Sequence, residues 1–176
     1  IAGLLMAGLI SDTLNLTSPT TTPTDVEIMK HLSSITGLDP AEFAAKIFAV
    51  GSPLTSMTPD EAVRSDSKEY HEYGRRFTVA QIEEISFTNY HEKKEALLEA
   101  LEAHCREGQY YFAALLVTDI NTQNSILLVR GDEEFMKQID YPGVGAYQWE
   151  LKGVVSRKKQ LLPYLLGCLQ KVEAAA

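Results

Sequence analysis

Two apolar runs in the middle of the chain constrain the fold most. They cover residues 110–117 and 125–129, and turn-forming residues bound both of them. Short apolar runs of this kind favour β-strands buried in the interior of a protein. The segment between them, residues 119–124, is too short to hold a helical crossover. The two strands are therefore predicted to pair antiparallel.

Helical patterns surround this pair of predicted strands. Aromatic and β-branched residues on both sides of Gly74 predict a β-hairpin over residues 70–82, and residues 147–155 predict a last strand. Apolar spacing and capping residues predict helices over residues 1–10, 26–36, 40–50, 91–106 and 161–172. We therefore expect an α/β (α+β) fold in which helices flank a mixed β-sheet.

The stretch 51–60 is predicted to separate two parts of the chain. It combines Gly, Pro and hydroxyl residues without periodicity, as linkers between domains do. The residues before it are few for a self-sufficient core, and the chain begins with Ile rather than Met. Residues 1–50 are therefore interpreted as the end of a larger lobe, and residues 61–176 as a separate domain.

Composition excludes several classes of partner. A net charge of −8 argues against general nucleic-acid binding, which needs a basic stripe with stacking aromatic residues. The apolar segment 1–10 is shorter than the ~20 residues that cross a bilayer, and it lacks a basic leader. Cys105 and Cys168 have no second Cys or His at the spacing of a metal site and are predicted to be buried free thiols. A cytoplasmic protein with no nucleic-acid and no membrane partner is expected.

Three consecutive cations, Arg157, Lys158 and Lys159, are unusual in so acidic a chain. A guanidinium fork and ammonium groups suit phosphate oxygens, and backbone N–H groups at a helix start favour anions. Pro163 is tolerated only in the first turn of the last helix, which places the cations at the helix N-terminus, facing outward. The alternative is a solvated basic turn with Ser156 as its N-cap.

Two other charged residues could join this cluster. Asp12 ends an apolar helix, and Lys68 precedes the predicted hairpin. A carboxylate that helps to hold a divalent cation, facing cations that hold phosphoryl oxygens, suits metal-assisted hydrolysis of a phosphoanhydride. A cap or turn role is the alternative for Asp12, and one carboxylate cannot form a metal site alone. Surface or helix positions, not metal ligation, are predicted for His31, His71, His91 and His104.

Three motifs resemble family II (manganese-dependent) inorganic pyrophosphatases of the DHH phosphoesterase superfamily. Residues 9–14 (LISDTL) with 17–20 (TSPT) are similar to the segment that closes the N-terminal DHH lobe. Residues 74–83 (GRRFTVAQIE) resemble the hairpin of the family, and residues 155–160 (VSRKKQ) resemble its substrate-binding signature. The resemblance implies that the chain comprises a tail of the DHH lobe (1–50), a linker (51–60) and the DHH-associated C-terminal substrate-binding domain (61–176).

The resemblance also implies roles for four residues. Asp12 would be an aspartate ligand to the second metal ion, Lys68 would contact the substrate, and Arg157 and Lys158 would grip its phosphoryl group. Mn²⁺ or Co²⁺, with Mg²⁺ bound to the substrate, would activate the hydroxide that attacks pyrophosphate. The whole protein would be a homodimeric hydrolase. The family's His-x-x-x-Asp-x-Asp and Asp-His-His motifs, which supply the other metal ligands, do not occur. The chain is therefore expected to be a C-terminal part that is inactive alone.

Two alternatives stay open from the sequence. A related exopolyphosphatase or another DHH-family phosphoesterase would also use a basic cluster, because any phosphoanhydride carries the same charge. A non-catalytic regulatory module that binds an anionic ligand is the second alternative. The compact SRKKQ cluster at residues 156–160 favours pyrophosphate.

Overall fold

The chain divides into two compact units, Ile1–Ser52 and Pro53–Ala176. The computed structural model describes residues 1–50 and 52–175. The predicted linker 51–60 contains regular structure, because Pro53 opens the short helix α4 (Pro53–Ser56) and Pro59 opens α5 (Pro59–Arg64). Gly51, which belongs to that prediction, lies outside the described residues.

The first unit consists of three helices. They are α1 (Ala2–Thr13), α2 (Pro23–Thr36) and α3 (Pro40–Val50), which confirm the three predicted helices of this region. Their small common core contains Met6, Ile10, Met29, Leu32 and Ala44. Leu4 and Leu5 of α1 remain 79% and 60% exposed, so this unit leaves apolar surface uncovered.

The second unit contains one six-stranded sheet with the strand order β1-β2-β3-β4-β6-β5. Strands β2 and β3 pair parallel, with α6 (Thr88–Glu107) as the crossover between them, and the other neighbouring strands pair antiparallel. The antiparallel pairing of β3 with β4 confirms the prediction. The strands are β1 (Lys68–Glu72), β2 (Arg75–Glu84), β3 (Phe112–Asp119), β4 (Asn124–Gly131), β5 (Gly143–Gly145) and β6 (Gln148–Lys152).

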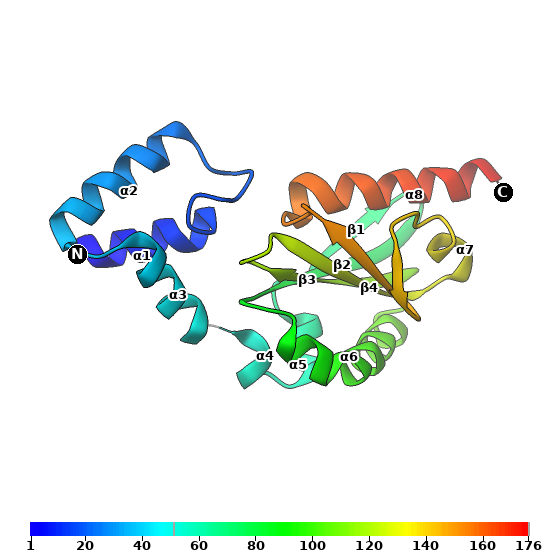
Figure 1. Cartoon of the computed structure of the whole chain (residues 1–176). Coiled ribbons are helices and arrows are strands. Elements are labelled where there is room, and N and C mark those ends of the chain that lie inside the picture. Colours follow the sequence, from blue (N-terminus) through cyan, green and yellow to red (C-terminus); the bar gives the residue numbers. More distant parts are fainter. Residues whose placement is uncertain (51, 176) are drawn as a thin grey trace. The chain divides into compact units, whose positions relative to one another are not determined.

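Helices cover both faces of this sheet (Figure 1), which confirms the predicted α/β (α+β) class. One core lies between the sheet and the helices α4, α5 and α6, and includes Leu97 and Leu115. The other lies beneath α7 (Glu133–Met136) and α8 (Leu162–Ala175), and includes Leu116 and Leu165. Successive residues of β3 thus enter opposite cores, which explains why its sequence is continuously apolar.

The predicted β-hairpin is formed by β1 and β2. Tyr73 and Gly74 connect the strands with φ values of 51° and 68°, and two such residues give a turn whose twist matches that of the strands. The register pairs Tyr70 with Phe77 and Lys68 with Val79. Lys68 therefore stands at the far end of the hairpin from its turn.

The last helix begins differently from the prediction. Arg157–Leu161 form a π-helical turn, η1, that continues directly into α8. Pro163 consequently lies beyond the first turn. A proline inside a helix clashes with the carbonyl four residues before it, here Lys159, and donates no hydrogen bond. The Leu161 N–H instead reaches back five residues to Ser156 O at 3.1 Å, and this wider turn makes room for the proline.

Among the described residues, no helix combines the length and apolarity that crossing a membrane requires.

Candidate anion-binding site

Polar side chains gather at one end of the sheet face that α8 covers. In β2, Val79 belongs to the core on this face, and Gln81 follows at the alternate spacing that keeps it on the same face. Thr118 of β3 and Ser125 of β4 lie at the same end, and their hydroxyl oxygens are 3.0 Å apart. This polar end of the sheet lies beneath the segment that connects β6 to η1.

The Gln81 side chain holds the start of η1. Its Oε1 accepts a hydrogen bond from the Arg157 backbone N–H at 3.0 Å. Its Nε2 donates to Val155 O at 3.0 Å and to Thr118 Oγ1 at 3.3 Å. Ser125 Oγ contacts the carbonyl oxygen of Val154 at 2.5 Å. The sheet thus fixes the backbone from Val154 to Arg157.

The residues of the basic segment also hold one another. Gln160 Oε1 accepts from the backbone N–H groups of Val155 and Ser156, each at 3.0 Å, and its Nε2 donates to Gly153 O at 2.8 Å. Ser156 Oγ accepts from the Lys159 N–H at 3.2 Å, so Ser156 is the N-cap, as the alternative reading of the basic turn supposed. Together with the Gln81 contact, these bonds occupy the N–H groups of Val155, Ser156, Arg157 and Lys159, which are among those that an anion at a helix start would use. Anion binding here therefore depends mainly on side chains.

The Arg157 guanidinium is buried, which corrects the prediction that all three cations face outward. Its side chain is only 9% exposed. Nη2 donates to Asp66 Oδ1 at 3.1 Å, while Nη1 donates to the Asp66 carbonyl oxygen and to Val79 O, the latter at 3.4 Å. Asp66 precedes β1 and adopts a left-handed φ of 39°, which turns its carbonyl toward the guanidinium. Arg157 is thus tethered at both its backbone and its guanidinium.

The structure brings Lys68 to the same corner as Arg157. Lys68 is the Cα partner of Val79, whose carbonyl oxygen contacts the Arg157 guanidinium, and it follows Asp66 by two residues. Lys68 and Lys158 are exposed, as is Lys159, and none of the three has an ion-pair partner in the part of the chain that the structure describes. One anchored guanidinium and three exposed lysines therefore belong to this corner: Lys68 through its pairing with Val79, and Lys158 and Lys159 through their adjacency to Arg157 in the chain.

Acidic groups border this corner. Glu83 follows Gln81 on the same face of β2, and desolvation together with repulsion from Asp66 raises the pKa of the Glu83 carboxyl. Glu83 therefore takes up a proton at higher pH than an ordinary glutamate. Acidification removes this negative charge from the edge of the basic corner.

Asp12 lies in the first unit and is exposed near the end of α1. Three successive residues after that helix, Leu14, Asn15 and Leu16, have φ values of 47°, 51° and 67°. Such a left-handed run is costly for residues other than glycine. Buried Thr13 holds it, because its Oγ1 donates to Leu9 O at 2.6 Å and accepts from the Leu16 N–H at 3.0 Å. A strained but well-bonded turn therefore follows Asp12 directly.

One carboxylate does not fit a complete metal centre. Divalent cations such as Mn²⁺ require several oxygen or nitrogen ligands from the protein. Within residues 1–50 and 52–175, no group of three or more His, Cys, Asp or Glu side chains is placed to hold a metal ion. Asp12 has no hydrogen-bond or ion-pair partner for its carboxylate among these residues. No step of a metal-assisted reaction can be derived from this chain alone.

Sequence reasoning missed the residues that position the site. Asp66, Gln81 and Gln160 were not singled out, although each forms at least two hydrogen bonds to the basic segment or its guanidinium. Gln81 and Gln160 lay within the quoted motifs GRRFTVAQIE and VSRKKQ, and Gln81 also follows Val79 at the spacing that keeps it on the same face of β2. The predicted buried free thiols, Cys105 and Cys168, are confirmed.

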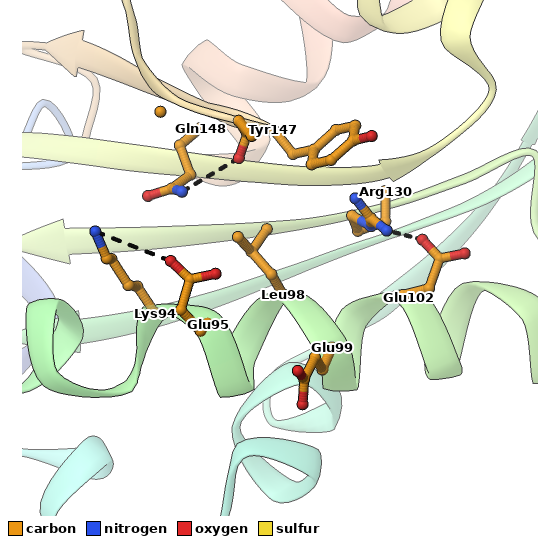
Figure 2. A pocket seen from close by; sticks show the side chains of 10 residues that line it. Lys94, Glu95, Leu98, Glu99, Glu102, Arg130, Tyr147 and Gln148 are labelled. Carbon is orange, nitrogen blue, oxygen red and sulfur yellow. Dashed lines mark hydrogen bonds and ion pairs between the residues drawn. The ribbon is translucent and has the colours of Figure 1, made fainter.

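A separate cavity lies on the opposite face of the sheet (Figure 2). Its volume is about 480 Å³, and α6 forms one wall with Lys94 and Leu98 while Tyr147 and Gln148 form another. Arg130 stacks over the Tyr147 ring at 3.9 Å. None of the four candidate site residues lines this cavity.

Known proteins match most of the chain. The family model described as DHHA2 domain matches residues 45–168. A "Probable manganese-dependent inorganic pyrophosphatase" of Lactobacillus acidophilus is 35% identical over 173 residues, which cover 94% of this chain and 54% of the relative. A "Manganese-dependent inorganic pyrophosphatase" of Methanocaldococcus jannaschii is 34% identical over 166 residues, with the same two coverages of 94% and 54%.

A solved structure agrees with these relatives. The structure titled "Crystal structure of Methanococcus jannaschii putative family II inorganic pyrophosphatase" matches with a TM-score of 0.80 and 34% identity. The match covers 95% of this chain and 54% of that one, so the chain spans about half the length of the relatives it matches. Because the DHHA2 match extends over more than half of this sequence, the chain belongs to the DHHA2 domain family.

Proposed function

We propose that this chain supplies the phosphate-binding part of a manganese-dependent inorganic pyrophosphatase, which hydrolyses pyrophosphate to two phosphates. One observation carries the proposal: Arg157 is anchored beside Lys68 and Lys158, two exposed lysines without ion-pair partners among the described residues. The DHHA2 domain and the names of the two relatives described above support it.

The proposed role of Arg157 follows from its donors. A guanidinium has five N–H groups, and three of them hold the Asp66 and Val79 oxygens in the described part of the chain. Two N–H groups therefore remain for a phosphoryl oxygen, on a side chain that is already immobilised. Lys68 and Lys158 add charge that neutralises the pyrophosphate and the leaving phosphate. An anchored donor loses little conformational freedom when the anion binds.

The metal in this proposal is Mn²⁺ or Co²⁺, accompanied by Mg²⁺ on the substrate. Asp12 would give one ligand, and the other ligands would come from residues that this chain does not contain. When bound, the metal supplies a hydroxide nucleophile at neutral pH. The proposal places the whole protein in the cytoplasm as a homodimer that needs neither nucleic acid nor a membrane. Buried free thiols at Cys105 and Cys168 suit a reducing compartment.

Phosphate release from pyrophosphate tests this function. The whole protein that carries this chain should release phosphate when Mn²⁺ is present, and this chain alone should not. Arg157→Ala or Lys158→Ala should lower turnover at least about tenfold, because each removes a charge-assisted contact worth roughly 1.5–3 kcal/mol. Absence of metal-dependent turnover would refute the function, and unchanged kinetics in both variants would refute the two residue roles.

Substrate comparison separates the pyrophosphatase from its alternatives. The same protein should prefer pyrophosphate over long polyphosphate and over short oligonucleotides. A preference for polyphosphate would identify an exopolyphosphatase, and a preference for oligonucleotides another phosphoesterase. Saturable anion binding without any turnover would identify a regulatory module.

A further inference from the structure

We propose that Gln81 is a positioning residue for the pyrophosphate site: its side-chain amide fixes the Arg157 backbone and so directs the guanidinium toward the substrate. The inference rests on the proposed function, because it concerns the same site. Within the part of the chain that the structure describes, Gln81 bonds to Thr118, Val155 and Arg157 and to none of the exposed lysines of the corner, so it acts through Arg157 and the backbone beside it.

The hydrogen bonds of Gln81 define one orientation of its amide. The Arg157 N–H needs an acceptor and lies 3.0 Å from Oε1, whereas the Val155 carbonyl needs a donor and lies 3.0 Å from Nε2. Reversing the amide would place donor against donor and acceptor against acceptor. This pair of hydrogen bonds therefore requires a side chain of the length of glutamine that carries both an acceptor and a donor.

The amide is itself supported by the sheet. Gln81 belongs to β2, where it is the Cα partner of Leu116 in the parallel pair with β3. Its Nε2 also donates to Thr118 Oγ1 at 3.3 Å, and that hydroxyl lies 3.0 Å from Ser125 Oγ. Hydroxyls from two further strands thus limit the motion of the Gln81 side chain. Through Gln81, the rigid sheet fixes the position of the Arg157 backbone.

Loss of Gln81 should misplace Arg157 without releasing it. The guanidinium would remain tethered to Asp66, and Gln160 would still hold Val155 and Ser156. The Arg157 N–H would lose its partner, and the backbone at that residue would be free to shift. Small displacements of a binding group can cost large factors in affinity or rate. The expected effect is on pyrophosphate binding more than on the fold.

The buried Gln148 provides a matched control. Its Oε1 accepts from the Tyr90 hydroxyl, and its Nε2 donates to Ala146 O at 3.2 Å. It lines the cavity against α6 on the opposite face of the sheet (Figure 2). Replacing either glutamine with leucine therefore removes a comparable amide, but only Gln81 contacts the basic segment.

The experiment measures pyrophosphate affinity by calorimetry on the chain of residues 1–176. Gln81→Leu should raise the dissociation constant about tenfold or more, and Gln148→Leu should leave it within about twofold. Both variants should lower the urea midpoint of unfolding. Gln81→Asn, which keeps the amide but is too short to reach both groups, should give an intermediate loss and serves if Gln81→Leu fails to fold.

A double-mutant cycle distinguishes positioning from general destabilisation. If Gln81 acts through Arg157, then Gln81→Leu or Gln81→Asn should change affinity by less than about twofold in an Arg157→Ala background. Equal losses in both backgrounds would overturn the inference, as would unaltered affinity in the Gln81 variants. If the unmodified chain binds no pyrophosphate at all, the phosphate-binding role proposed for this chain fails, whatever the Gln81 variants do.

Discussion

Arg157 forms an ion pair that joins the interior of the second unit to its surface. Its side chain is 9% exposed while that of Asp66 is 61% exposed, so the ion pair reaches from the interior to the surface. Removing one partner of such a pair leaves the other without compensation, which is costly when that group is buried. The cluster of basic residues can be recognised in the sequence. The burial of Arg157 cannot, because it depends on a contact with Asp66, which is far away in the chain.

His104 is the second residue with an unusual environment. It is buried in α6, and neither ring nitrogen has a hydrogen-bond partner within the described residues. Desolvation, followed by repulsion from Arg64 of α5, lowers the pKa of His104 below its ordinary value of 6.5, although Asp60 and Glu107 act in the opposite direction. The folded protein therefore favours the neutral ring.

This environment predicts a pH dependence of stability. As pH falls below about 6.5, the unfolded chain protonates His104 before the folded chain does, so the free energy of unfolding should decrease. Above that pH, the free energy of unfolding should not be reduced by protonation of His104. His104→Leu should flatten the dependence between about pH 7.5 and 5.5, because no proton uptake remains at this site. Urea unfolding across this range measures it, and an equally steep dependence in the variant would contradict the assignment.

At the scale of elements, the π-helical turn is the feature that sequence reasoning anticipated least. Proline was expected to force a new helix start close to Pro163. The chain instead widens the preceding turn, so Arg157–Leu161 remain helical and the cations lie within the turn itself. Wide turns of this type are frequent at functional sites.

Pro163→Ala tests whether the proline maintains that turn. Alanine can donate its N–H and has no ring, so the last helix should become regular through this region and the free energy of unfolding should rise by about 1 kcal/mol or more. Regularisation would rotate the cations, and pyrophosphate affinity should fall roughly tenfold. Urea unfolding and calorimetry together measure both effects.

Pro59→Ala is the control for this prediction. Pro59 is the first residue of α5, a position that suits proline, and it lies outside the basic segment. This variant should not gain stability, and its pyrophosphate affinity should equal that of the unmodified chain. Unaltered affinity in Pro163→Ala would show that the wide turn does not matter for binding.

Other elements differ in how well their sequences reveal them. β3 and β4 were predictable because buried strands with a short connection leave few alternatives. β5 was missed, because the three residues Gly143, Val144 and Gly145 form an exposed edge strand without an apolar pattern. α6 begins at Thr88, three residues before the predicted start, where no side chain caps the helix.

At the scale of the whole molecule, the candidate site draws on residues far apart in the chain. The cations were recognisable from their clustering, and Asp12 and Lys68 were recognisable as charged residues at the ends of predicted elements. The family resemblance added a role for each of them. The supporting contacts of Gln81 and Asp66 follow from strand register and from a left-handed backbone at Asp66, which short-range patterns do not encode. The sequence therefore identified the charged groups, and the tertiary structure shows why the Arg157 side chain is immobilised.

The central claim is that the corner around Arg157 binds pyrophosphate. Calorimetric titration of pyrophosphate into the chain of residues 1–176, with Arg157→Ala and with Lys94→Ala as a control on the opposite face, tests it most directly. Binding should be saturable, should weaken at least about tenfold in Arg157→Ala and should stay unchanged in Lys94→Ala. No binding by the unmodified chain, or equal affinity in Arg157→Ala, would contradict it.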